Sequence, residues 1–301
     1  MNNFLIIANK QKDINLEITE QIKHHITRMG AVCNVYDQYN RNVTSIDIPE
    51  GTQCILVIGG DGTILAAARM LVGNTIPLLG INLGTLGFLA DVNLADLSKT
   101  LDLLLKDQYQ VENRIMLTAE VYKQGEKAAT YIALNDFNIN RCGASRVIGL
   151  KVGINGSTID CYRADGVIVC TPTGSTAYAL SAGGPIIEPE FSCIEMTLIC
   201  PHSLSARPIL FSPESRLCVS LQEQDVRDVY ISADGAPPIC LDAYHRMEIY
   251  RSPHEISLID LSGNTFFDSL NRKMMQSLKG ESEKEKVTKW EKKNDTPQSW
   301  N

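Results

Sequence analysis

Residues 54–72 read CILVIGGDGTILAAARMLV, so that an apolar run, a glycine-rich turn and a helical pattern follow one another directly. The run from Cys54 to Ile58 predicts a buried strand, and Thr63 to Val72 predicts a helix. Between them, the glycines of Gly59 to Thr63 let the backbone approach a phosphate, which the positive end of the helix attracts. The stretch therefore predicts an α/β fold with a phosphate-binding turn, and an ordinary glycine-rich connection is the alternative.

The sequence on either side of this turn alternates between strand and helix patterns. Further strands are predicted at Phe4 to Ala8, Val32 to Tyr36 and Ile76 to Asn82. Helices are predicted where Ile14, Ile18, Ile22, Ile26 and Met29 recur at helical spacing, and over Ala95 to Lys106. Such alternation is typical of a mainly parallel sheet covered by helices. Residues 1–108 are therefore expected to form a Rossmann-like α/β domain that contains the GGDGT loop.

A second pattern begins at about Tyr109, where apolar and polar residues alternate with period two. The dipeptide Asn155-Gly156 between two such runs is a strong signal for a β-hairpin. Residues 109–259 are therefore expected to form an all-β, β-sandwich-like domain. A helical pattern over Asn264 to Leu278 predicts that residues 260–280 return to the first domain. The charged residues 281–301 are expected to be a disordered tail.

Composition restricts the class of protein and its partners. The 301 residues carry a formal net charge of −7, which argues against binding to nucleic acid or to an anionic membrane. No run approaches the ~18 apolar residues that span a bilayer, and the N-terminus lacks the cationic lead of a signal peptide. The nine cysteines form no CxxC pair and the five histidines have no metal-ligand spacing. We expect a cytoplasmic protein with reduced thiols.

Three common nucleotide signatures do not account for the glycine turn. The sequence contains no GxxxxGK[ST] loop and no HRD or DFG triplet, so a P-loop or a protein-kinase site is not predicted. The dinucleotide fingerprint fails at its third glycine, where Leu65 stands, which makes a dehydrogenase the weaker interpretation. Asp61 lies inside the turn, and a carboxylate beside phosphates is unfavourable unless it holds a metal or takes a proton. A general base is therefore predicted at Asp61.

A second candidate segment, Thr171 to Pro185, reads TPTGSTAYALSAGGP and is dense in hydroxyl groups and small residues. Its backbone allows close approach, its hydroxyls are hydrogen-bond donors, and Tyr178 supplies one aromatic ring. These are the groups that hold a ribose and stack on an adenine. A linker is the alternative, although the apolar strand before the segment argues against it.

These motifs together resemble the NAD kinase family. The resemblance rests on GGDGT at residues 59–63, LND at residues 134–136, TPTGSTAYALSAGGP at residues 171–185 and ISADG at residues 231–235, and it spans nearly the whole chain. GGDG also occurs in diacylglycerol and sphingosine kinases and resembles a phosphofructokinase motif, so TPTGSTAY is what selects NAD kinase. The family implies transfer of the γ-phosphoryl group of ATP to the 2′-hydroxyl of the adenosine ribose of NAD.

The resemblance also implies a role for each matching position. Asp61 is implied as the catalytic base, and Gly59, Gly60, Gly62 and Thr63 are implied to bind the ATP phosphates. The all-β domain is implied to bind NAD. The positions implied to contact NAD are Asp61, Gly62, Phe88, Asn135, Asp136, Arg146, Arg163, Asp165, Thr173, Ser175, Thr176, Ala177, Tyr178, Ala179, Leu180 and Ser181.

Several of these positions have an alternative interpretation. An amide donates and a carboxylate only accepts, so Asn135 and Asp136 together can bond both hydroxyls of a ribose. The same pair would also suit a hydrophilic strand end, and many family members carry Glu at the position of Asp136. Arg146 is equally well explained as a solvated charge at a hairpin end, and Phe88 as a residue packed at the domain interface. Ala236 departs from the family, where many members have Gln.

The resemblance implies ATP and NAD as substrates and a divalent cation, expected to be Mg²⁺ held mainly by the ATP phosphates. It also implies self-association as a dimer or tetramer, with a homotetramer expected. Two rival functions keep some of the motifs. A diacylglycerol-type lipid kinase would share the glycine loop, and a non-catalytic NAD sensor would share the dinucleotide site.

Overall fold

The computed structural model describes residues 1–39, 43, 45–84, 87–90, 92–143, 147–222, 229–242, 244–261, 263, 265–273 and 275. The chain divides into two compact units, Met1–Ser262 and Gly263–Asn301. In the second unit residues 266–273 are helical. The proposed return of residues 260–280 to the first domain stays a prediction, and the proposed tail lies outside the described residues.

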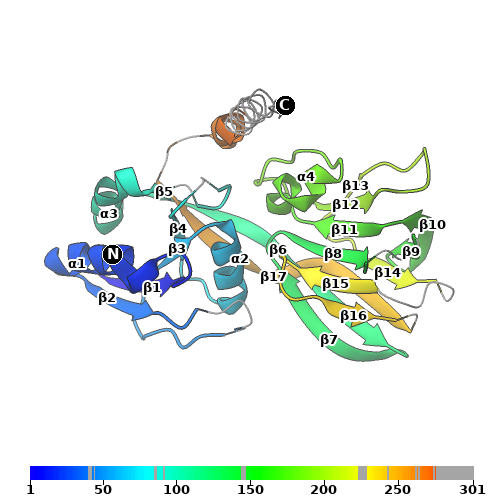
Figure 1. The fold of residues 1–301 in the computed structure, drawn as a ribbon, viewed down its shortest axis with the longest axis horizontal. Helices are drawn as coiled ribbons and strands as arrows, with labels where there is room; N and C mark the ends of the chain where they lie inside the picture. The colour runs from blue at the N-terminus through cyan, green and yellow to red at the C-terminus, as the bar shows by residue number, and fades with distance from the viewer. Residues whose placement is uncertain are drawn as a thin grey trace, which may run out of the picture. The chain divides into compact units, whose positions relative to one another are not determined.

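The first part of unit Met1–Ser262 is the predicted parallel sheet (Figure 1). Its strands are paired in the order β4-β3-β1-β2, with the short β5 beside β4. The strands are β1 (Asn3–Ala8), β2 (Val32–Tyr36), β3 (Cys54–Gly59), β4 (Leu78–Asn82) and β5 (Val92–Asn93). The helices are α1 (Glu17–Arg28), α2 (Asp61–Met70) and α3 (Leu97–Leu105), with 3-10 turns at Ile14–Leu16 and Leu94–Asp96.

Alternate residues of the central strands supply two cores, one on each face of the parallel sheet. Phe4 and Ile6 of β1 pack in one cluster with the apolar faces of α1 and α3. Leu5 and Ile7 pack in the other with α2. Burial on both faces explains why β1 and β3 are continuous apolar runs rather than alternating ones. The sheet therefore places the end of β3, and with it the glycine turn, on a rigid support.

The second part consists of two β-sheets that enclose a third core, formed by residues such as Phe137, Ile139, Val167 and Ile231. One sheet has six strands in the order β13-β12-β11-β8-β15-β16. Its strands are β8 (Asp136–Arg141), β11 (Gly166–Cys170), β12 (Ile194–Ile199), β13 (Ile209–Phe211), β15 (Val229–Ala233) and β16 (Ile239–Leu241). Two short helices, η3 (Thr173–Thr176) and α4 (Tyr178–Ser181), follow β11.

The other sheet is continuous with the parallel one. Its further strands are β6 (Gln110–Lys123), β7 (Glu126–Ala133), β9 (Ile148–Ile154), β10 (Ser157–Ala164), β14 (Leu217–Leu221) and β17 (His245–Asp260). Strand β17 pairs along its length with β6 and touches β4 through Leu258 and Leu78. The predicted fold class, an α/β domain followed by a β-rich domain with a final helix, is confirmed, while the domain boundaries stay predictions.

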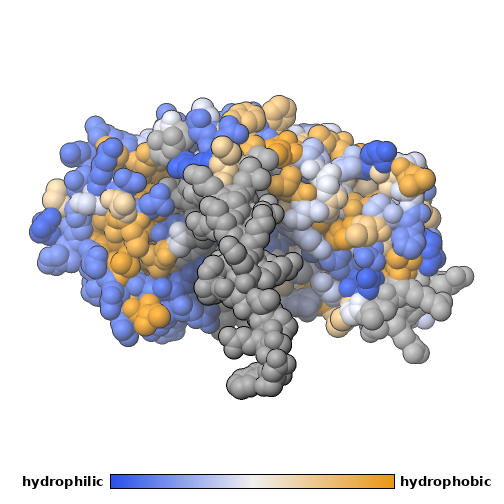
Figure 2. All heavy atoms as spheres, turned by 45° about the horizontal axis from the view of Figure 1, so that its top comes forward, coloured by the Kyte–Doolittle hydropathy of each residue, from blue (hydrophilic) through white to orange (hydrophobic). Residues whose placement is uncertain are grey.

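Within the described residues, no helix is both long enough and apolar enough to cross a bilayer. Figure 2 shows hydrophilic and hydrophobic residues intermixed over the visible face of the molecule.

Candidate active site

The glycine turn joins the last residue of β3 to the first residue of α2. Gly60 is the N-cap of α2 in an extended conformation, and Asp61 opens the helix. A Cβ on Gly59 would collide with the Thr63 side chain, so glycine is required for the turn to close. The Thr63 hydroxyl is buried and accepts a hydrogen bond of 3.1 Å from Asn9 Nδ2. The helix N-terminus and the three glycines suit an anion, and phosphate binding at this turn stays a prediction.

The carboxylate of Asp61 is held by the loop that precedes β5. Its Oδ2 accepts a hydrogen bond of 2.7 Å from the Phe88 amide, and its Oδ1 accepts one of 3.2 Å from the Leu89 amide. Gly87 lies directly against this carboxylate, since a Cβ there would overlap with the Asp61 oxygens. A carboxylate has about four acceptor positions, so two remain for a substrate hydroxyl or a cation. Phe88 contributes through its backbone and is half-buried.

Lys12 is a residue that the sequence interpretation missed. Its Nζ lies 3.3 Å from the position that a Cβ on Gly60 would occupy, and the side chain is exposed. The lysines that form ion pairs among the described residues are Lys10, Lys123 and Lys127. The signal in the sequence was its position just after β1, because the carboxyl ends of neighbouring parallel strands meet at one edge. Lys12 thus adds to the glycine turn an ammonium group that forms no ion pair with the described residues.

The pair Asn135-Asp136 lies where β8 begins. Asn135 is 9% exposed, and its Oδ1 is buried without a hydrogen-bond partner in the described part of the chain. Such an orphan acceptor costs free energy unless a donor from a ligand reaches it. Burial, followed by the charge of Asp234, raises the pKa of Asp136 to about 7. Both side chains are therefore suited to a ligand that supplies hydroxyl groups.

Asp234 has a role that its sequence context did not suggest. It lies in a hairpin turn with Gly235, both in the left-handed region, as the Asp-Gly dipeptide predicts. Its side chain is fully buried, however, and accepts hydrogen bonds from the backbone amides of Leu134, Asn135 and Asp136. Asp234 therefore holds the strand end that carries the candidate NAD residues.

The hydroxyl-rich segment packs directly against Leu134 and Asn135. Thr171 Oγ1 donates a hydrogen bond of 2.6 Å to the Leu134 carbonyl, and a Cβ on Gly174 would collide with the Asn135 backbone. Ser175 is buried and its hydroxyl donates to the Pro172 carbonyl at 2.7 Å. The structure thus places the LND motif and the TPTGSTAYALSAGGP motif in direct contact.

The other members of this segment differ in how far they are open to a ligand. Thr173 is buried, and the Thr176 hydroxyl donates to its carbonyl at 3.4 Å. Ala179 is fully buried against β11, whereas Tyr178 and Leu180 are 41% and 39% exposed. The residues of the short α4 helix that are exposed to solvent are therefore Tyr178, Leu180 and Ser181.

Three further charged residues were predicted to contact NAD: Arg146, Arg163 and Asp165. Arg163 is exposed, while Asp165 forms an ion pair with Arg141, with 2.6 Å between Arg141 Nε and Asp165 Oδ1. Arg141 was not singled out by the sequence because it lies 24 residues from its partner. Arg146 lies outside the described residues.

No group of three or more His, Cys, Asp and Glu side chains that could hold a metal occurs among the described residues. The Asp61 carboxylate beside the glycine turn is an oxygen donor of the type that Mg²⁺ prefers. This donor fits a cation that takes most of its remaining ligands from a nucleotide.

Comparison with known proteins identifies the family. Residues 9–109 match the ATP-NAD kinase N-terminal domain, and residues 134–261 match the ATP-NAD kinase C-terminal domain. The NAD kinase of Lachnoclostridium phytofermentans is 40% identical over 281 residues, which cover 91% of this chain and 99% of that protein.

Solved structures give the same result. Yeast NADH kinase, crystallised with NADH, superposes with a TM-score of 0.78 at 26% identity, covering 90% of this chain and 86% of that one. An NAD kinase from Archaeoglobus fulgidus in complex with ATP gives a TM-score of 0.70 at 23% identity over 87% of this chain and 94% of that one, which supports the fold. The chain therefore belongs to the NAD kinase family.

Proposed function

We propose that this chain transfers the γ-phosphoryl group of ATP to the 2′-hydroxyl of the adenosine ribose of NAD. The 2′-oxygen forms a bond to the γ-phosphorus, the bond from that phosphorus to the β–γ bridging oxygen breaks, and ADP and NADP are the products. The observation that supports this best is the pairing of two features. A glycine turn carries an oriented carboxylate, and a second segment carries, beside Asp136, a buried Asn135 oxygen that has no hydrogen-bond partner among the described residues.

Asp61 is proposed as the general base that accepts the proton of the 2′-hydroxyl. The amides of Phe88 and Leu89 fix the direction of its carboxylate before the substrate binds, so little reorganisation is needed. The amides at the start of α2 and the Lys12 ammonium would face the ATP phosphates. A divalent cation, proposed to be Mg²⁺, would offset charge on those phosphates when bound, with Asp61 as a protein ligand.

Asn135, Asp136 and the segment after β11 are proposed to bind NAD. The Asn135 and Asp136 side chains would bond the ribose hydroxyls, because each is buried at the strand end beside Thr171. Tyr178 is exposed enough for its ring to stack on a base. Arg163 offers a guanidinium fork of the kind that binds a pyrophosphate.

Incubation of the purified protein with NAD, ATP and Mg²⁺, followed by detection of NADP with an NADP-specific dehydrogenase, tests the proposal. We expect NADP to form in proportion to protein. If NAD binds and no NADP appears, the protein is a non-catalytic NAD sensor rather than a kinase. If NAD does not bind and the protein floats with liposomes, a lipid kinase replaces both.

Self-association as a homotetramer and location in the cytoplasm are also proposed. The family resemblance supports the tetramer, and exposed apolar side chains near the edge strand β13 offer a surface for it: Phe191, Leu204 and Leu210. All nine cysteines are described and none forms a disulfide, which suits a reducing compartment. Light scattering at micromolar concentration measures the mass, and a monomer would contradict the assembly.

Replacing Lys12 by alanine is expected to raise KM for ATP about tenfold, the ratio given by one charge-assisted hydrogen bond of about 1.5 kcal/mol. KM for NAD should stay unchanged because Lys12 lies at the glycine turn. Steady-state kinetics with each substrate varied in turn measure both constants. Lys10→Ala is the matched control, since Lys10 pairs with Asp37. An equal rise of KM for ATP in both variants would remove Lys12 from the phosphate site.

The affinity for NAD is expected to rise with pH through about 7, the value to which the pKa of Asp136 is raised. Below that pH the protonated carboxyl offers fewer acceptor positions to the ribose hydroxyls. If only the ionised form binds, Kd falls about tenfold between pH 6 and pH 8. Calorimetric titration measures Kd, and Asp136→Asn should lose most of this dependence. An unchanged pH profile in that variant would contradict the assignment.

A further inference from the structure

One carboxylate outside the proposed contact residues has an unusual environment. The side chain of Asp234 is fully buried, and four donors surround its two oxygens. Oδ1 accepts from the amides of Asn135 at 2.7 Å and Asp136 at 3.2 Å. Oδ2 accepts from the Leu134 amide at 2.9 Å and from Arg69 Nη1 at 3.2 Å. An aspartate in a hairpin turn does not need four such hydrogen bonds to form the turn.

These bonds shape the strand end that presents the candidate NAD residues. Between β7 and β8 the chain leaves the ladder at residues 134 and 135, so its amides need other acceptors. Asp234 supplies them, and its own amide donates to the Asp136 carbonyl at 3.0 Å. On the other side Thr171 bonds the Leu134 and Asn135 carbonyls. The backbone that carries Asn135 and Asp136 is thus fixed from two sides.

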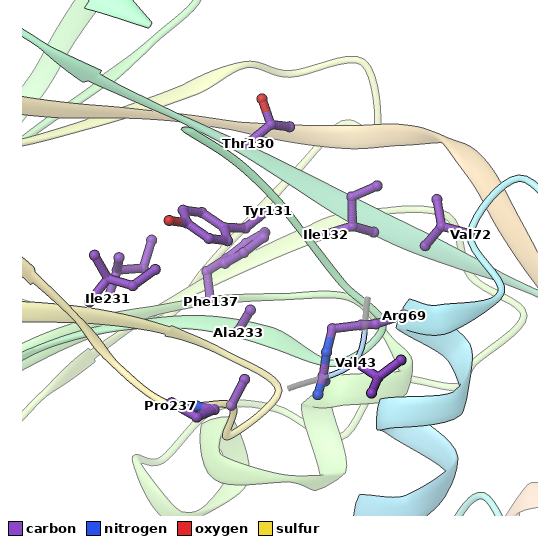
Figure 3. Close-up of a pocket in the computed structure, with 12 residues that line it drawn as sticks. Val43, Arg69, Val72, Thr130, Tyr131, Ile132, Phe137, Ile231, Ala233 and Pro237 are labelled. Atoms are coloured by element: carbon purple, nitrogen blue, oxygen red, sulfur yellow. The ribbon is translucent and has the colours of Figure 1, made fainter. Parts of the chain in front are cut away.

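Arg69 links this anchored segment to the glycine turn. It lies on α2, the helix that begins with Asp61, and a helix keeps the spacing between its first and last turns nearly constant. Its side chain is 16% exposed. Figure 3 shows it extending from α2 beside Ala233 and Phe137, which line a cavity of about 430 Å³ with apolar walls. The ion pair therefore lies in a partly desolvated setting, where charges interact strongly.

We propose that Asp234 is a positioning residue of the NAD site and that Arg69 sets the place of that site relative to the helix that carries Asp61. The inference rests on the proposed assignment of Asn135 and Asp136 to NAD. Asp234 touches neither substrate: it acts through the backbone of residues 134–136. The Asp-Gly dipeptide indicates only a hairpin turn, whereas the buried Asp234 carboxylate faces the backbone of residues 134–136.

The test uses full-length Asp234→Asn and Arg69→Leu. In Asp234→Asn one acceptor oxygen becomes a donor amide that opposes an N–H group, which displaces the strand end. We expect KM for NAD to rise about tenfold or more in both variants with KM for ATP within about twofold, the pattern of a lost ground-state alignment at one substrate. Arg69→Lys should recover most of the affinity. Arg251→Leu, which breaks the exposed pair with Glu255, is the matched control and should resemble wild type.

A second readout separates positioning from simple stabilisation. Because the charge of Asp234 raises the pKa of Asp136, Asp234→Asn should move the midpoint of pH-dependent NAD binding to lower pH. Arg69, which pairs with Asp234, and Cys170, the cross-strand partner of Asp136, are both unchanged in this variant. If Asp234→Asn does not fold, Arg69→Leu decides through the two KM values.

The outcomes distinguish the inference from the function on which it rests. Asn135→Ala is measured in the same assay. If it raises KM for NAD while Asp234→Asn and Arg69→Leu lower only the melting temperature, the inference is wrong and the NAD site stands. If Asn135→Ala leaves KM for NAD unchanged, the assignment of the site fails, and the inference fails with it.

Discussion

Replacing Asp61 by asparagine is expected to lower kcat for NADP formation by about a thousandfold, within the range that removal of a general base gives. The neutral amide has nearly the same shape as the carboxylate, and one of its atoms can still accept a bond from the Phe88 or Leu89 amide. The fold and the Kd for NAD should therefore change little. Single-turnover formation of NADP, together with calorimetric binding of NAD, measures both quantities.

Asp96→Asn is the control for this prediction, because Asp96 is an exposed aspartate at the N-cap of α3 and lies outside the site. It should have wild-type turnover. A turnover of Asp61→Asn within about tenfold of wild type would be smaller than the loss of a base allows. In that case the carboxylate orients the glycine turn or a cation, and another group accepts the proton.

The sequence predicted correctly those strands and helices whose pattern of buried residues is set within the element itself. The strand, turn and helix of residues 54–72 were predicted within two residues, since β3 is buried on both faces and the turn needs glycine. The first helix was predicted to include Ile14, which is 70% exposed. It begins at Glu17 instead, because Leu16 adopts a left-handed conformation and Asp13 accepts the Ile18 and Thr19 amides.

Contacts between distant residues explain what local patterns did not predict. The period-two region that begins at about Tyr109 includes residues 129–139, but the structure breaks the strand there between Ala133 and Asp136. The break is stabilised by Asp234, about a hundred residues later in the chain, which accepts the amides of the interrupted ladder. Nothing in the alternation of apolar and polar residues carries that information.

Some residues of the candidate site were likewise predicted from local sequence, and others were not. The motifs around Asp61, Asn135 and Tyr178 were found because their residue types are unusual for their positions in strands and turns. Lys12 and Arg69 were not, because a lysine after a strand and an arginine on a helix are each ordinary alone. Their roles follow from neighbours in space: Gly60 beside the Lys12 ammonium, and the Asp234 carboxylate beside Arg69.

Replacing Gly87 by alanine is expected to lower kcat about a hundredfold, the loss that a misplacement of about 1 Å produces at a reacting group. The added Cβ would overlap with the Asp61 oxygens, so the carboxylate or the loop must move. Either movement weakens the bonds from the Phe88 and Leu89 amides and turns the base away from its proposed direction. KM for ATP and NAD should change less than kcat, because Phe88 is the only position of residues 87–89 implied to contact NAD, and the glycine turn, Asn135 and Asp136 lie outside this loop.

Gly84→Ala in the same loop is the matched control. A Cβ there meets no atom of the described residues within 4 Å, so kcat should remain within about twofold of wild type. Thermal unfolding of both variants shows whether the loss at Gly87 is one of geometry or of stability. If Gly87→Ala retains full turnover, the direction of the Asp61 carboxylate seen here does not matter for the reaction. If it loses turnover while its melting temperature stays near that of Gly84→Ala, then orienting the base is a function of the loop itself.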